Sequence, residues 1–324
     1  MQSVMKAIGL GILASLFFAS TFVLNQTMSL HGGSWLWTSS LRYFYTVPVL
    51  AIWVAWRGEL PKLASLMTRR PWPWFLWGTV GFGLFYAPLT FAAAYGPSWA
   101  VASTFQLTII IGSLLVPFTT HQKIPWRHLW PSVPILAGIA MVQWQSHVAL
   151  NQSLFVSLAA VLLSAVAYPL GNRKMMALTT GDISAVTRIL GMTIGSLPFW
   201  IVLAGIASVS AGRPPVWQWE ETFWVAMSSG IVATALFFRA TDQAQGRPDT
   251  LAKVEATQSM EIVFTLLLAL IFHLPGHADV ASIAGMALVM GGMVWHAVGR
   301  PLSKWGQTRP VADASNVTAS LLDD

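Results

Sequence analysis

The sequence predicts an all-α integral membrane protein: ten transmembrane helices in two inverted five-helix repeats, with both termini cytoplasmic. Three observations support this fold class: the composition, the spacing of long apolar runs, and the placement of lysine and arginine. Of the 324 residues, 55% are hydrophobic and 9% are charged, and the mean hydropathy is +0.61. A soluble domain carries about 25% charged residues. The composition therefore excludes an ordinary cytosolic enzyme, a nucleic-acid-binding protein and a disordered chain.

Apolar runs of about 20 residues, the length that crosses the hydrocarbon core of a bilayer, recur along the whole chain. The first is expected to be a retained helix, because it is longer than the core of a signal peptide and no clear cleavage site follows it. The ten expected spans lie near residues 4–25, 33–56, 73–95, 98–119, 129–146, 153–171, 186–208, 221–241, 250–272 and 279–298.

Basic residues alternate between two sets of loops, and loops rich in lysine and arginine stay in the cytoplasm. The loops after spans one, three, five, seven and nine contain Arg213 alone. This asymmetry predicts a multi-pass protein of the cell membrane with both termini cytoplasmic, and it explains the net charge of +6 without a nucleic-acid partner. The cytoplasmic set comprises Lys6, Arg57, Lys62, Arg69, Arg70, Lys123, Arg127, Arg173, Lys174, Arg239, Arg247, Arg300, Lys304 and Arg309.

Two halves of five spans each are expected. Spans four and five resemble spans nine and ten, since a Gly/Pro segment precedes each pair and a glycine-containing apolar helix ends it. Because five is odd, the second half would enter the membrane from the opposite side, which is the inverted repeat of many transporters. The expected parts are residues 1–149, residues 150–299 and a mobile cytoplasmic tail at 300–324. Chance similarity between apolar helices that contain glycine is the alternative.

Two short segments carry a resemblance to a known family. The segment 18–23 (FASTFV) and the segment 41–43 (LRY) are similar to signatures of the drug/metabolite transporter superfamily. Over about 4–298 the chain resembles its multidrug resistance efflux branch, the ten-span EamA-like relatives of the small four-span exporters. The resemblance implies a proton- or gradient-driven carrier, such as an antiporter, of small organic molecules. The four-span exporters carry an essential glutamate in their first helix, whereas span one here has no acidic residue.

Charged residues inside spans are costly and need a reason, since each costs at least about 2.5–3.5 kcal/mol at mid-bilayer. Four stand out: Arg42, Lys253, Glu255 and Glu261. At about 1.5 Å per residue, Arg42 lies roughly 13 Å below the outer edge and Glu261 roughly 16 Å above the inner edge. The two are therefore expected to pair at one depth. Lys253 and Glu255 form a second charged pair near the cytoplasmic end.

Polar residues at helical spacing extend these sites. Thr38 and Tyr45 lie on the face of span two that carries Arg42, and Gln258 lies on the face of span nine that carries Glu261. Polar faces are unfavourable in lipid, so both are expected to point inward. Glu261 is interpreted as the coupling carboxylate. For Arg42, a binding role and a structural role remain open alternatives.

Other polar positions are weaker candidates. Tyr86 on span three and Thr104 on span four could line a cavity, as could Asn25, whereas Gln106 lies on a different face from Thr104. Contacts between helices are the alternative for each of them.

The expected function is a secondary transporter that exports small organic molecules by alternating access, coupled to protons or another gradient. A small-molecule substrate, membrane lipid and protons are the expected partners, and a homodimer is left open. No cofactor is expected, and no metal, because the chain lacks cysteine and its histidines lack metal-ligand spacing. The alternatives are an intramembrane lipid-modifying enzyme, for which the sequence offers no nucleophile motif, and a non-transporting membrane protein. The four charges within spans sum to zero and select no substrate charge.

Overall fold

The computed structural model describes residues 2–115, 129–145, 152–179, 183–243 and 248–298. The expected boundary at residue 149, the tail at 300–324 and the basic loop residues Lys123 and Arg127 lie outside these ranges. Within them, all regular secondary structure is helical. The elements of the first part of the chain are α1 (Gln2–Leu30), α2 (Trp35–Trp56), α3 (Leu60–Arg69), α4 (Pro71–Gly78), η1 (Thr79–Gly83), α5 (Leu84–Ala92), α6 (Ser98–Phe105), α7 (Leu107–Leu114) and α9 (Ser132–Gln145).

The second part of the chain is helical in the same way. Its elements are α10 (Gln152–Leu178), α11 (Ala185–Ser210), α12 (Val216–Val225), η3 (Ala226–Ala233), α13 (Thr234–Gln243), α14 (Pro248–Ala256), η4 (Thr257–Ser259), α15 (Met260–Ile271) and α16 (Val280–Val298).

Seven helical segments among the described residues are long and apolar enough to cross a membrane. Two further expected spans form shorter apolar helices, 98–114 and 132–144. The remaining one, α2, has 22 residues and contains Arg42, and it is not among the seven. The chain is therefore a multi-pass, all-helical membrane protein.

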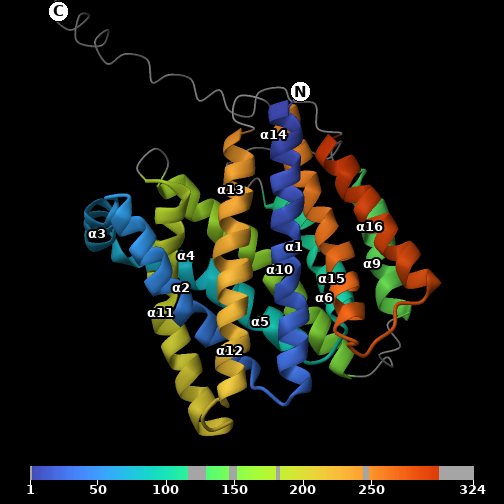
Figure 1. The fold of residues 1–324 in the computed structure, drawn as a ribbon, viewed down its shortest axis with the longest axis horizontal. Coiled ribbons are helices and arrows are strands. Elements are labelled where there is room, and N and C mark those ends of the chain that lie inside the picture. Colours follow the sequence, from blue (N-terminus) through green and yellow to red (C-terminus); the bar gives the residue numbers. More distant parts are fainter. Residues whose placement is uncertain (1, 116–128, 146–151, 180–182, 244–247, 299–324) are drawn as a thin grey trace, which may run out of the picture.

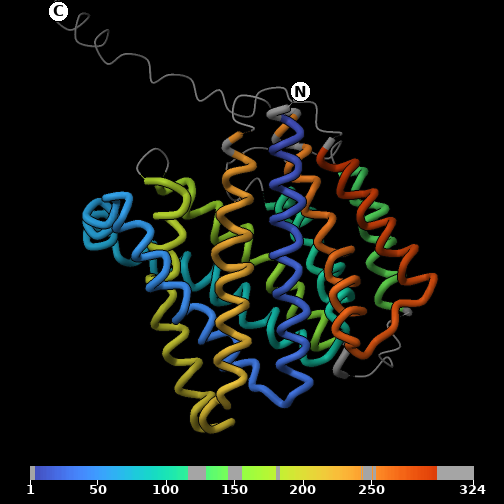
Figure 2. Tube along the Cα trace, in the orientation of Figure 1, coloured from blue at the N-terminus to red at the C-terminus, as the bar shows by residue number. Residues whose placement is uncertain are grey.

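Helix α1 runs through the middle of the bundle in Figure 1 and packs against η3, α13 and α15. Helix α2 lies on one side of α1 and packs against α11, while α9 and α16 pair at the far side. The N-terminal end of α1 and the C-terminal end of α16 lie at the same end of the bundle, as the tube in Figure 2 also shows. This arrangement places α2 and α15 on different sides of α1.

The loop expected after span two contains a helix, α3. Its Leu63 is buried, whereas Lys62 and Arg69 are exposed. The sequence predicted only a basic loop here, because ten residues are too few to cross a bilayer.

Several spans are interrupted within their length. Wide π-helical turns, η1 and η3, lie in the third and eighth expected spans. The α-helical pattern breaks at Gln106 between α6 and α7, and a 3₁₀ turn, η4, separates α14 from α15. Such interruptions often mark functional positions, because they free backbone groups and re-aim side chains.

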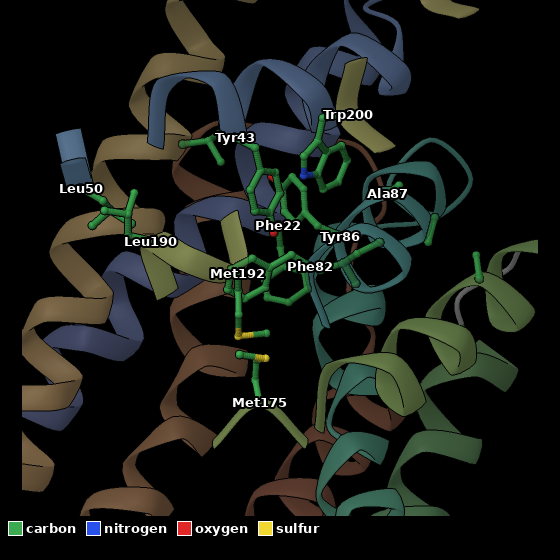
Figure 3. Packing of buried hydrophobic residues seen from close by; sticks show 14 of the residues in the cluster. Phe22, Tyr43, Leu50, Phe82, Tyr86, Ala87, Met175, Leu190, Met192 and Trp200 are labelled. Carbon is green, nitrogen blue, oxygen red and sulfur yellow. The ribbon is translucent and has the colours of Figure 1, made fainter. Parts of the chain in front are cut away.

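The largest apolar cluster lies between α2, α5, α10 and α11. Tyr43 stacks on Trp200 with ring centroids 4.3 Å apart, close to Phe82 and Tyr86 (Figure 3). Both Trp200 and Tyr86 are fully buried. This cluster fixes the backbone of α2 on either side of Arg42.

Glycine allows α9 and α16 to approach closely. A Cβ added to Gly138 would lie 2.4 Å from the carbonyl oxygen of Gly285, and one added to Gly285 would lie 2.8 Å from the carbonyl oxygen of Gly138. Small residues at helix crossings in membranes permit such backbone contact. The pair is thus held by van der Waals packing that larger side chains would prevent.

Candidate functional site

Arg42 lies two turns into α2 and is held by two neighbours. Its Nη1 donates to Thr21 Oγ1 over 3.3 Å, and its Cζ lies 4.1 Å from the centroid of the Tyr86 ring. The second contact is a cation–π interaction, which stabilises a guanidinium without neutralising its charge. Arg42 is only half-buried, so part of the side chain faces space that the protein leaves open.

Tyr86 connects Arg42 to a second polar side chain. Its ring lies beneath the guanidinium, and its hydroxyl donates to Asn25 Oδ1 over 3.1 Å. Asn25 is 3% exposed, and its Nδ2 has no hydrogen-bond partner within the described part of the chain. A buried donor without a partner is unfavourable and calls for an explanation.

Thr21 fixes the guanidinium from α1. Its hydroxyl accepts from Arg42 and donates to Ser229 Oγ, and the Ser229 hydroxyl in turn donates to the Val225 carbonyl oxygen. Each hydroxyl therefore donates its proton to the next group in the chain. The oxygen of Thr21 is left to accept the hydrogen bond from Arg42. Helices α1, α2 and the π-helical segment η3 meet at this chain of hydrogen bonds.

Glu261 lies where two interrupted helices meet. It is in the first turn of α15, directly after η4, and its Oε2 accepts from Gln106 Nε2 over 3.5 Å. Gln106 occupies the break between α6 and α7 and is 3% exposed. The carboxylate benefits from the positive end of the α15 dipole. The hydrogen bond is long, so Glu261 is held loosely.

Aromatic rings form a continuous wall from the Arg42 region to the Glu261 region. The Phe85 ring lies 6.0 Å from Tyr86, 5.5 Å from Phe105 and 4.8 Å from Tyr168, between centroids. Phe105 directly precedes Gln106, and Tyr168 lies within electrostatic range of Glu261. Tyr168 is 39% exposed and Phe85 and Phe105 are half-buried, so each ring keeps surface that the described part of the protein does not cover.

The expected ion pair between Arg42 and Glu261 is not formed. Arg42 contacts Thr21 and Tyr86, whereas Glu261 contacts Gln106, and neither of these two described residues reaches the other. The helical rise gives an expected depth for each charge but not its direction around the bundle. Helix α15 packs against α1 and α6, while α2 packs against α5, α11 and α12. The two charges therefore stand at separate places.

Three of the expected site residues have contacts with side chains other than Arg42 and Glu261. Thr38 is buried and accepts from Gln218 Nε2 over 2.9 Å, so it joins α2 to α12. Thr104 accepts from Gln143 and faces α9. Tyr45 packs on Trp219 and Phe223 and lines a separate cavity of about 620 Å³. Other residues lining that cavity are Val216, Glu220 and Trp224.

The remaining expected residues belong to the helix that carries Glu261. Gln258 lies in η4, one turn before Glu261, and is half-buried. Lys253 and Glu255 lie in α14, where Lys253 is exposed and Glu255 half-buried. Their roles stay predictions.

Three residues that the structure places at the site are not strong candidates from the sequence alone. Gln106 and Asn25 were weak candidates, and Thr21 entered only as part of the segment 18–23. Gln106 was detectable as a lone amide in an apolar run, but nothing in its spacing pointed to Glu261. Its contact arises from the break at Gln106, which no periodicity reveals.

A polar contact joins the start of α11 to Glu59, which lies in the α2–α3 connection outside the expected spans. Glu59 Oε2 accepts from the Thr187 hydroxyl and from the Ser184 backbone N–H, and Glu59 Oε1 lies 3.3 Å from Arg57 Nε. The hydrogen bond from Thr187, with those from Ser184, lowers the pKa of Glu59 below its ordinary value of 4.5. Ionised Glu59 therefore stabilises the start of α11.

Comparison with known proteins agrees with this architecture. The family model "EmrE: Putative multidrug resistance efflux transporter" matches residues 5–300, nearly the whole chain. The chain belongs to this family. Membership confirms the resemblance inferred from segments 18–23 and 41–43, and it indicates a drug or metabolite efflux transporter in a lipid environment.

Two relatives are similar in sequence over most of the chain, and their names state no activity. The chain is 47% identical over 305 residues to "Uncharacterized protein YjlA" of Bacillus subtilis (strain 168), covering 90% of this chain and 94% of that protein. It is 46% identical over 268 residues to "Uncharacterized 42.1 kDa protein in intracellular alkaline protease 3'region" of Shouchella clausii. The match covers 80% of this chain and 71% of that protein.

A solved structure, described only as the crystal structure of a protein, shares the fold. Its TM-score is 0.61 at 17% identity, with 90% of this chain and 96% of that chain covered. At this identity the likeness shows the arrangement of helices and nothing about the molecule that is carried.

Proposed function

We propose that the protein is a secondary transporter that exports small organic molecules across the cell membrane by alternating access, coupled to protons at Glu261. The observation that carries the proposal is the position of this carboxylate. It lies inside the bundle, at the meeting point of two interrupted helices, and its side chain is held by one amide over a long 3.5 Å hydrogen bond. An acid so placed can take up and release a proton without breaking a strong ion pair.

The division into two inverted halves, 1–149 and 150–299, is part of the proposal. It is supported by matching irregularities: the third helix of each half contains a π-helical segment, η1 or η3, and the fourth is interrupted, at Gln106 or at η4. The fifth helices, α9 and α16, pack on each other through glycine. Paired discontinuous helices at a repeat interface are typical of transporter sites. With both termini cytoplasmic, the halves would enter from opposite sides.

Protonation would link to movement through the same contact. Ionised Glu261 accepts a hydrogen bond from Gln106, whereas a protonated carboxyl group is a weaker acceptor and carries no charge for the α15 dipole. Loss of that contact would free α6 and α7 to move relative to α15. A proton and a substrate could thereby favour different arrangements of the same two interrupted helices.

Flux through proteoliposomes tests this function. Purified protein is reconstituted with pyranine, a pH-reporting dye, trapped inside, and a pH gradient is imposed. Three probes are added in turn: ethidium as a cation, p-toluenesulfonate as an anion and p-toluenesulfonamide as a neutral molecule. A coupled carrier is expected to move protons in response to at least one probe, and counterflow of that probe should distinguish it from a channel. Proton movement equal to that of empty liposomes with all three probes would contradict the proposal.

A further inference from the structure

We propose that Arg42 and Asn25 bind the oxyanion group of the transported molecule, a carboxylate or sulfonate on an apolar organic body. This inference rests on the proposed transport function and names its substrate class. It begins from the separation of the two charges, since an Arg42 engaged with Glu261 would have no need of an anionic ligand.

Arg42 is a cation without a carboxylate partner in the described part of the chain. One of its five N–H groups donates to Thr21, and its face lies on Tyr86. The other donors remain available on a half-buried side chain. An arginine inside a membrane bundle normally pairs with an acid or with backbone carbonyl groups. A planar fork of free N–H groups is well suited to bind two oxygens of one anion.

Asn25 supplies an independent second donor. Its Nδ2 is buried and unpaired among the described residues, and its Oδ1 is already occupied by the Tyr86 hydroxyl. With the Tyr86 hydroxyl donating to Oδ1, the group of Asn25 that lacks a partner among the described residues is the Nδ2 donor. Both unsatisfied groups beside Tyr86 are donors, so the ligand that completes the site must present acceptors. An oxyanion meets this requirement, whereas an ammonium group does not.

The guanidinium is positioned before any ligand arrives. Thr21 receives its hydrogen bond while donating to Ser229, which donates to the Val225 carbonyl oxygen. Three elements, α1, α2 and η3, therefore hold Arg42 in one orientation. Preorganisation of this kind lowers the entropic cost of binding.

The apolar body of the ligand has a surface beside this donor pair. Phe85 is adjacent to Tyr86, and its ring packs with Phe105 and Tyr168, each of which keeps exposed surface. Aromatic faces bind apolar and aromatic groups without selecting one structure. The site would therefore accept a class of organic anions rather than a single compound.

Binding to the full-length protein in detergent tests the inference without any gradient. Melting temperature is followed as p-toluenesulfonate, p-toluenesulfonamide or benzyltrimethylammonium is added, because a ligand of the native state raises the apparent stability. The three probes are similar in size and differ in charge. A rise with the sulfonate, with no comparable rise for the other two, is expected. Equal shifts for all three probes, or a shift with the cation alone, would overturn the inference.

Variants localise the effect. Arg42→Gln is expected to weaken sulfonate binding about tenfold or more, as loss of a charged hydrogen-bond partner does. Asn25→Asp preserves the volume and the acceptor for Tyr86, but it supplies a carboxylate beside Arg42 and should abolish the shift. Arg213→Gln, in an exposed loop, is the matched control. If Arg42→Gln does not fold, the sulfonate-induced shift in the melting temperature of Asn25→Asp tests the assignment instead. Sulfonate binding unchanged in a folded variant of either site residue would contradict the assignment.

A lipid phosphate presents the same oxyanion chemistry, so a further arm adds phosphatidylglycerol. We expect it not to displace p-toluenesulfonate; displacement, or stabilisation by the lipid alone, would overturn the assignment to a transported molecule. Because this assay has no gradient and does not involve Glu261, sulfonate binding can fail while proton-coupled flux stands, and the reverse can occur as well.

Discussion

Gln106 Nε2 lies 3.5 Å from Glu261 Oε2, and each residue stands where a helix is interrupted. The contact joins α7, which begins after Gln106, to α15, whose first turn contains Glu261. A neutral amide can hold the carboxylate without neutralising it, unlike an arginine, which would fix it as an ion pair. In the proposed function, this relationship lets Glu261 bind and release a proton.

Replacing the amide tests that relationship. Gln106→Leu removes the donor while approximately preserving volume, and we expect probe-driven proton flux in proteoliposomes to fall at least about tenfold, the effect of losing a hydrogen bond to a charged group. Gln143→Leu is the control, since it removes a nearby amide that binds Thr104 rather than Glu261. Equal flux in the two variants would argue against a role for Gln106.

The hydrogen bonds that Glu59 accepts predict that the stability of the folded protein depends on pH. Its pKa is lowered in the folded protein by the Thr187 hydroxyl and by Ser184, so its contribution is present above its ordinary pKa of 4.5 and is lost as pH falls through the folded value. Glu59→Gln should lower the stability by about 1 kcal/mol at neutral pH, because the group is partly exposed. The difference in melting temperature from wild type should shrink on acidification below pH 4.5. Glu220→Gln is the control, and a difference independent of pH would contradict the prediction.

The close approach of α9 and α16 at Gly138 predicts that a larger residue there destabilises the protein. The Cβ of Gly138→Ala would lie 2.4 Å from the Gly285 carbonyl oxygen, so the helices must separate, and we expect a loss of about 1–3 kcal/mol as for overpacked cores. Gly291→Ala, on the partner helix α16, meets nothing within 4 Å and should leave stability unchanged or slightly raised. Thermal unfolding in detergent compares them. Similar melting temperatures for the two variants would contradict close packing at Gly138.

The fold was largely predictable from sequence because its signals are local. Runs of apolar residues and their spacing determine where helices form. Within the described ranges the helices follow the expected spans, such as α2 within 33–56 and α16 within 279–298. What composition does not show is where a helix is interrupted. The π-helical segments η1 and η3 and the break at Gln106 depend on packing between distant segments, such as the contact of Gly81 with Gly171.

The site was predicted less well, and for a related reason. Arg42 and Glu261 were identified because charges in lipid are costly wherever they occur. Their partners depend on the rotation of each helix and on which helices are neighbours, and one sequence fixes neither. Thr21, Asn25 and Gln106 were therefore undervalued, while Thr38, Tyr45 and Thr104 share helices with the site but contact other residues.

The most direct test of the central claim is proton-coupled flux in Glu261→Gln. The variant keeps the size and polarity of the side chain but cannot exchange a proton. With pyranine-loaded proteoliposomes, an imposed pH gradient and a probe that the wild type carries, we predict that Glu261→Gln folds and loses probe-driven proton movement. Glu220→Gln, which removes an exposed carboxylate on α12, should retain it. Proton movement by Glu261→Gln at the wild-type rate would contradict the account.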